Sequence, residues 1–180
     1  MKAIILLALA FVLAGTAGAE EKSVDEQISA ALLPLPEDLR VGAAVIGYNT
    51  EGEQIVLRRG TNNFTCMADS PAPQFFVVCY PNIIAEYRAR SDELLATGIP
   101  EHEYRDIVSA EIEAGKLNVP DRAVIYYLSG VNLQNALPLI AIYLPGATAE
   151  STGLSTVPNP FRPWLMFGGT AAAHIMVPGK

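Results

Sequence analysis

Short apolar segments separated by turn-forming residues predict several β-strands. Val41 to Tyr48 is an apolar run rich in β-branched residues, and Gln54 to Arg58 alternates between polar and apolar positions. Asn49 to Gly52, between them, has the composition of a tight turn, so the two segments predict a hairpin. Phe75 to Tyr80 is apolar on both alternating faces, which indicates a strand buried within a sheet. Further strands are expected at residues 124–128, 139–144, 164–167 and 175–177.

Three other segments have the apolar spacing of helices. Ser23 and Glu26 form a capping box at the start of a short first helix, and two longer helices are predicted between Asn82 and Lys116. Because strands and helices do not strictly alternate, we predict an α+β fold in one domain, residues 20–180. Its mostly antiparallel sheet carries the short N-terminal helix and two central helices on one face. Residues 145–163 predict no element, and loops of that length are usually functional or loosely ordered.

The first residues of the chain resemble a secretory signal peptide. A basic start at Lys2 is followed by an apolar run from Ala3 to Ala14, and Ala17 to Ala19 has the small residues of a cleavage site. We therefore expect residues 1–19 to be removed and the mature chain to begin at Glu20. No later stretch is long and apolar enough to span a bilayer, so we predict an exported, periplasmic or extracellular protein without an integral membrane span.

Export makes a disulfide between the two cysteines the expected state. Cys66 and Cys79 enclose a short segment with two prolines, Pro71 and Pro73, which favours a turn-rich connection between them. In an oxidising compartment a bridge of this loop size stabilises the fold by about 3 kcal/mol.

The negative net charge of the chain argues against some classes of binding partner. The chain has 19 acidic and 12 basic residues, for a formal net charge of −7. Nucleic acids and anionic membranes attract basic patches, so neither is an expected partner. An unknown small ligand or an envelope protein fits the composition better.

Three patches of the sequence carry a resemblance to a family of small exported bacterial proteins without an assigned activity. They are residues 65–71 with Cys79, residues 127–130, and residues 163–170 running on to 173–178. The resemblance implies export and a compact domain, but no reaction. The family pattern usually has Pro-His-Ile-Met where this chain has Pro138-Leu139-Ile140-Ala141, so a first histidine and its methionine are missing here.

His174 and Met176 are candidate ligand-binding residues. They are two positions apart on a predicted strand, so their side chains share a face. Imidazole with thioethers is a donor set for copper, and Met67 and Met166 would join it if the motifs converge. Methionine is also common core filler, and a single histidine beside apolar residues is more often structural. We therefore predict no metal and no cofactor.

Asp69 and Trp164 complete the candidate set. Asp69 follows Cys66 in a turn, where its carboxylate accepts backbone amides or faces a ligand. Trp164 is either a ligand-contacting wall beside residues 145–163 or an anchor in the core, and we favour the anchor. Cys66, His174 and Asp69 are the residue types of a thiol hydrolase, with a nucleophile, a base and an orienting acid. A disulfide at Cys66 would remove the nucleophile.

Two classes of function follow. The first is an exported, non-enzymatic module that binds a small ligand or an envelope partner, since the sequence contains no catalytic motif that outweighs a structural explanation. The second is a periplasmic or secreted hydrolase that uses His174 and Asp69, with residues 145–163 as a lid. An enzyme is expected to place His174 on the floor of a cavity, hydrogen-bonded to an acid.

Overall fold

The computed structural model describes residues 22–179, apart from the side chains of residues 101 and 102, and it confirms the α+β class with a mostly antiparallel sheet. The predicted signal peptide, residues 1–19, and the predicted start at Glu20 lie outside the described residues. The described strands are β1 (Ala44–Tyr48), β2 (Gln54–Arg58), β3 (Phe64–Met67), β4 (Phe75–Pro81), β5 (Ala123–Gly130), β6 (Leu137–Tyr143), β7 (Trp164–Met166) and β8 (His174–Pro178). The described helices are α1 (Val24–Ala31), α2 (Glu37–Arg40), α3 (Ala85–Ala96), α4 (Glu101–Glu113) and α5 (Ala149–Thr152).

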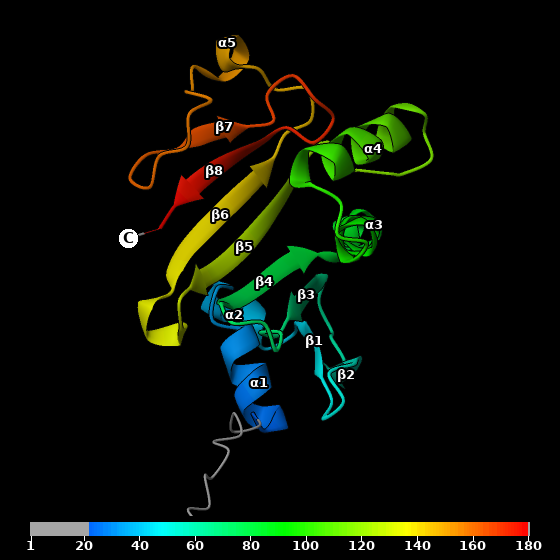
Figure 1. Ribbon diagram of the computed structural model, residues 1–180. Coiled ribbons are helices and arrows are strands. Elements are labelled where there is room, and N and C mark those ends of the chain that lie inside the picture. Colours follow the sequence, from blue (N-terminus) through cyan, green and yellow to red (C-terminus); the bar gives the residue numbers. More distant parts are fainter. Residues whose placement is uncertain (1–21, 180) are drawn as a thin grey trace, which may run out of the picture.

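The eight described strands form one sheet in the order β2-β1-β3-β4-β5-β6-β8-β7 (Figure 1). The predicted hairpin is β1 with β2, and β1 also pairs with β3 in parallel, whereas every other neighbouring pair is antiparallel. The sequence pattern does not predict β3, because four residues are too few to show a strand period.

Helices cover both faces of the sheet, so the prediction that they lie on one face is wrong. Helix α1 packs on the face that carries Val45, Cys66 and Cys79, and its first turn has the predicted capping box. Helices α3 and α4 lie on the opposite side of the sheet (Figure 1). The reason is visible in β4, where Val77 and Val78 point to opposite faces and both are buried.

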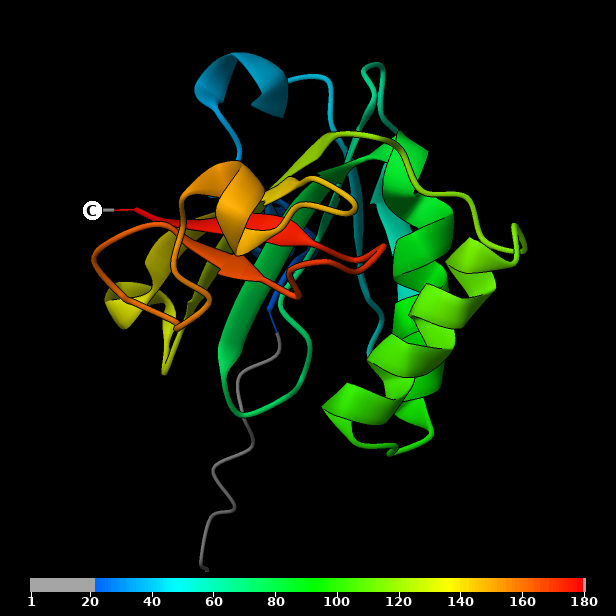
Figure 2. The same ribbon diagram turned by 90° about the horizontal axis from the view of Figure 1, so that it is seen from above.

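Helices α3 and α4 lie side by side at one side of the sheet (Figure 2). Their contact contains the buried side chains of Leu94, Val108 and Leu117. Arg90 on α3 also donates hydrogen bonds to both carboxylate oxygens of Glu111 on α4, at 2.6 to 3.2 Å. An apolar contact and a bidentate ion pair therefore hold the two helices together.

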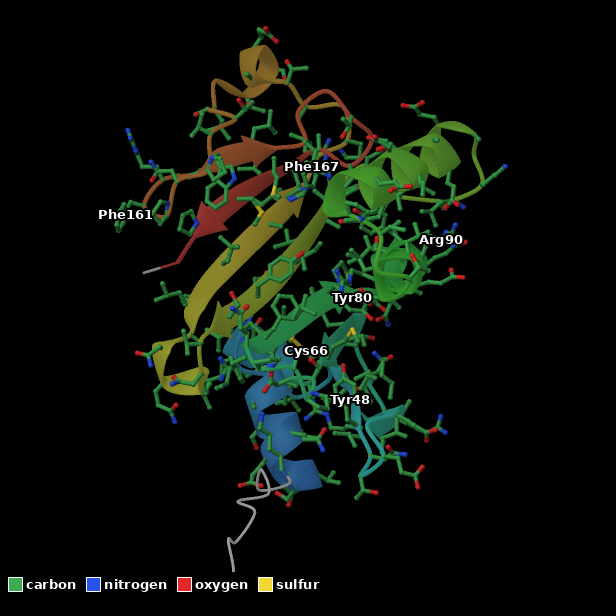
Figure 3. All side chains as sticks on the ribbon, in the orientation of Figure 1. Tyr48, Cys66, Tyr80, Arg90, Phe161 and Phe167 are labelled. Atoms are coloured by element: carbon green, nitrogen blue, oxygen red, sulfur yellow. A yellow bond between two sulfur atoms is a disulfide. The ribbon has the colours of Figure 1, made fainter. Side chains whose placement is uncertain are left out.

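The predicted disulfide is present between Cys66 and Cys79, which are directly opposite on β3 and β4. Both cysteines are fully buried beneath α1, and Figure 3 labels Cys66 in that part of the sheet. The bond excludes Cys66 as a thiol nucleophile.

Residues 145–163 contain α5, which the sequence pattern did not predict. Ala147 and Leu154 from this segment pack against Leu165 of β7 and Ile175 of β8. The segment is thus partly ordered by contact with the sheet. None of the described helices is both long and apolar enough to cross a bilayer.

Candidate functional site

A cavity of about 350 Å³ lies between the sheet and the helix pair α3 and α4. Residues of β4, β5, β6, β7 and β8 line its sheet side, and residues of both helices line the other. Its wall is dominated by seven rings: Phe76, Tyr87, Tyr104, Tyr127, Tyr143, Phe167 and His174. Cavities of this size, apolar with a few convergent polar groups, are typical small-molecule sites.

Strand alternation explains the sheet side of the cavity. Tyr127 on β5 and Tyr143 on β6 face the cavity, as do the residues two positions away from each along the strand. Ala141 of β6 is almost fully buried at the floor of the cavity. Ile125 of β5 and Met176 of β8 lie directly opposite it on the two neighbouring strands. The short side chain of Ala141 leaves space that a larger residue would fill.

Helices α3 and α4 supply the other wall. Tyr87 and Ser91 are one helical turn apart on α3, and the Ser91 hydroxyl donates to the Tyr87 carbonyl at 2.9 Å. The Tyr87 ring meets the Tyr143 ring edge-on, with centroids 5.6 Å apart, and the Tyr143 hydroxyl donates to the carbonyl of Ala171 at 2.9 Å. These contacts hold the aromatic rings of both walls in defined orientations.

Burial favours the protonated form of three of the tyrosine hydroxyls in the cavity. It raises the pKa of Tyr87, Tyr127 and Tyr143 above the ordinary value of 10.0, because a phenolate loses hydration in this environment. At neutral pH the cavity therefore offers neutral phenol groups that donate and accept hydrogen bonds.

Arg88 is the cation of the cavity wall and has one unsatisfied donor. Its Nη2 contacts Asp92 Oδ1 at 2.9 Å, one turn further along α3. Burial raises the pKa of the Asp92 carboxyl, and the charge of Arg88 opposes that shift. The Nε atom of Arg88 is buried without a hydrogen-bond partner among the described residues. A buried donor without a partner costs about 1–3 kcal/mol, so an acceptor on a ligand would recover that free energy.

His174 lines the cavity as a neutral imidazole with a fixed tautomer. Its Nδ1 lies 2.8 Å from the carbonyl oxygen of Ala172, and because a carbonyl only accepts, Nδ1 carries the proton. Burial lowers the pKa of His174, which favours the neutral ring with a lone pair on Nε2. The ring is parallel to Tyr143, at 6.4 Å between centroids, and perpendicular to Phe167, at 5.2 Å.

Phe167, labelled in Figure 3, forms the end of the cavity near α4. It has φ of 55° and is the one non-glycine residue with positive φ in the described chain. Its carbonyl accepts hydrogen bonds from the amide and hydroxyl of Thr170, at 3.2 and 2.8 Å. The Arg105 guanidinium lies over its ring, 4.3 Å from the centroid. These contacts stabilise an otherwise unfavourable backbone conformation at the cavity wall.

The structure does not bring Asp69 to His174. Asp69 lies at the end of β3, where its carboxylate pairs with Lys22 and accepts the Phe76 amide at 2.8 Å. It lines two other cavities, of about 600 and 500 Å³, that His174 does not line. The contact to the Phe76 amide spans the loop between β3 and β4. The acid and base that the hydrolase hypothesis requires are therefore in separate places, and the Nδ1 partner of His174 is a backbone carbonyl.

The larger cavity beside Asp69 is a weaker candidate site. Its wall is mostly apolar, and its charged residues include Lys22 and Asp69, which pair with each other. Lys22 is also the first described residue, so this cavity borders the part of the chain that the structure does not describe. The aromatic cavity, by contrast, combines polar side chains from three strands, β5, β6 and β8, with polar side chains from two helices, α3 and α4.

Trp164 is on the same sheet face as His174 and Met176 but does not line the aromatic cavity. It is half-buried directly opposite Met176, and its Nε1 is buried without a hydrogen-bond partner in the described chain. No residue between 145 and 163 lines the cavity, so this segment does not act as its lid in the described structure.

The sequence pattern did not select Tyr87, Arg88, Tyr104, Tyr127, Tyr143 or Phe167 for the site. Four of the seven tyrosines of the chain line this one cavity, but they come from four separate elements, and no local sequence pattern brings them together. Tyrosines that face inward on separate elements bring polar hydroxyls into one interior space.

Among the described residues, which leave out the side chains of residues 101 and 102, no group of three or more histidine, cysteine, aspartate or glutamate residues is arranged to hold a metal ion. Comparisons with family models, curated proteins and solved structures found no match to this chain. The resemblance noted from the three sequence patches therefore stays a prediction.

Proposed function

We propose that this protein is an exported, non-enzymatic module that binds a small ligand in the aromatic cavity. The observation that carries the proposal is the cavity itself, which joins four tyrosines to a buried, unpaired Arg88 donor. A flat apolar ligand suits the tyrosine rings, and an oxygen acceptor on that ligand suits the Arg88 Nε–H. His174 supports binding rather than hydrolysis, because its Nδ1 contacts a backbone carbonyl and not the carboxylate that orients a general base.

The ligand class is tested with 2-naphthoate and naphthalene as matched probes, with and without a carboxylate. We expect 2-naphthoate to bind more tightly, measured by calorimetry or by NMR shifts of cavity residues. Arg88→Met should weaken binding of 2-naphthoate by about tenfold or more, as expected for a hydrogen bond to a charged group, and leave that of naphthalene unchanged. The control is Arg59→Met, which alters an exposed arginine outside the cavity.

The location of binding is tested by filling the cavity. Ala141→Leu places three additional carbon atoms at its floor and should abolish binding of both probes. Circular dichroism and thermal unfolding of the variant establish that it is folded. Undiminished probe binding by folded Ala141→Leu would move the ligand site away from this cavity.

Export is the second part of the proposal. The signal-like residues 1–19 and the Cys66–Cys79 disulfide support it, since disulfides persist in oxidising compartments. N-terminal sequencing of material recovered from the periplasm or medium should begin at Glu20. Retention of residues 1–19 in a membrane fraction would instead identify that segment as an anchor.

A further inference from the structure

Two thioethers and one imidazole lie at neighbouring positions on β7 and β8, at one end of the cavity. Met166 is directly opposite His174 in the antiparallel pair, and Met176 is two positions beyond His174 on the same face. All three line the aromatic cavity. Side chains directly opposite on antiparallel strands have Cβ atoms about 4.5–5.5 Å apart, and diagonal neighbours about 7–8 Å. Long, flexible methionine side chains reach across both separations.

The orientation of His174 suits metal ligation through its other ring nitrogen. The proton on Nδ1 is directed at the carbonyl of Ala172 at 2.8 Å, which leaves Nε2 with the free lone pair. Histidines that ligate metals almost always donate their second ring N–H to such an acceptor, which fixes the ring orientation. The contact to Ala172 therefore provides the support that a histidine ligand needs.

The chemical type of the three ligand side chains indicates which metal ion the site would bind. Two thioethers and one imidazole are uncharged ligands, and the thioethers are soft, a combination that suits Cu(I). Calcium and magnesium require oxygen ligands, and the described residues contain no cluster of histidine, cysteine and carboxylate ligands of the kind zinc takes. Phe167 and Tyr143 flank His174 with aromatic faces and edges, which limits access of water to the ion.

We propose that His174, Met166 and Met176 form a binding site for one Cu(I) ion at the β7–β8 end of the aromatic cavity. The site is separate from the Arg88 donor, which belongs to α3 on the opposite wall, so it does not depend on the proposed organic ligand. Trp164, directly opposite Met176, is the single tryptophan of the chain and serves as an internal optical reporter.

The test is an anaerobic titration of the mature protein with Cu(I) in the presence of a chromophoric Cu(I) chelator. The expected result is one bound ion per chain and a change in Trp164 fluorescence that saturates at the same stoichiometry. Met166→Leu and Met176→Leu conserve side-chain volume, and each should weaken Cu(I) binding by about tenfold or more. His174→Gln should weaken it at least as strongly.

The matched control is Met67→Leu, which changes a methionine that lines a neighbouring cavity and not this one. It should bind Cu(I) like the unaltered protein. Thermal unfolding of the metal-free leucine variants keeps loss of binding distinct from loss of fold. Failure of the protein to retain Cu(I) against the chelator would overturn the assignment. Equal losses in Met67→Leu and Met166→Leu, or tighter binding of zinc than of Cu(I), would also overturn it.

Discussion

Phe167 shows how one residue at the cavity wall combines backbone strain with side-chain packing. Its φ of 55° is a conformation in which a bulky L-residue is a true outlier. Two hydrogen bonds from Thr170 hold its carbonyl, and its ring contacts both His174 and Arg105. The turn after β7 therefore positions an aromatic wall that an ordinary backbone conformation would direct elsewhere.

The positive φ of Phe167 predicts that a glycine variant is more stable than an alanine variant at this position. Phe167→Gly should be more stable than Phe167→Ala by about 1 kcal/mol, because glycine adopts positive φ without the steric cost that alanine meets. Urea unfolding measures the difference. Phe161→Gly and Phe161→Ala are the matched pair at an exposed position without positive φ, where alanine should be at least as stable. The same order at both positions would show that Phe167 stores no strain.

The disulfide is the second residue-scale feature with a measurable contribution. Its sequence separation of 13 predicts that replacing both Cys66 and Cys79 with alanine lowers the free energy of unfolding by about 3 kcal/mol. Reduction of the unaltered protein, verified by intact mass, should lower its stability by a similar amount. Reductant should have no effect on the double variant, and unchanged stability of fully reduced unaltered protein would contradict the prediction.

At the scale of elements, the contact between α3 and α4 determines one wall of the cavity. The Arg90 guanidinium, hydrogen-bonded to Glu111, holds the pKa of that carboxyl below its ordinary value of 4.5. A lowered carboxyl pKa means that the unfolded chain binds the proton more readily. The pair therefore contributes stability above about pH 4.5, and the contribution is lost as the pH falls through the lower pKa of the folded state.

This linkage predicts the pH dependence of a helix-pair variant. Glu111→Gln should be less stable than the unaltered protein at neutral pH, and the difference should shrink as the pH falls below 4.5. Urea unfolding at a series of pH values measures it. Glu113→Gln, at an exposed position of the same helix, is the control and should show a smaller difference. A difference for Glu111→Gln that grows toward low pH would reverse the assigned sign.

At the scale of the whole molecule, different elements pack on the two faces of the sheet. One face carries the disulfide and α1, and the other carries the aromatic cavity. Helices α3 and α4 lie on the cavity side of the sheet (Figures 1 and 2). The cavity is therefore built on the face whose cover is a pair of helices joined to the sheet at β4 and β5.

The sheet order predicts a gradient of hydrogen exchange across the molecule. Strands β4, β5 and β6 each have two paired neighbours and buried residues, whereas β2 and β7 are the edges of the described sheet. Amides in the central strands should exchange slowest and those of the edge strands fastest, because edges open without disrupting the core. Native-state exchange read by NMR measures this order. Protection of β2 equal to that of β5 would indicate an additional partner at the β2 edge.

The sequence pattern predicted strands and helices well where local periodicity is strong. The capping box at Ser23, the hairpin of β1 and β2, and the doubly apolar β4 are all properties of consecutive residues. It did not predict β3, whose four residues are stabilised as a strand by pairing with β1 and β4. It also did not predict α5, a four-residue helix whose flanking residues Ala147 and Leu154 pack against β7 and β8. Pairing partners far along the chain decide such short elements.

For the candidate site, too, local sequence determined some features and the tertiary structure decided the others. The sequence alone determined that His174 and Met176 share a face and that Cys66 and Cys79 form a plausible bridge, because strand parity and loop length are local properties. The tertiary structure decided that Met166 lies opposite His174 and that Asp69 lines different cavities. Strand order depends on contacts between residues distant in the chain, which no local period encodes. The aromatic cavity is therefore a product of sheet order and of how α3 and α4 pack on it.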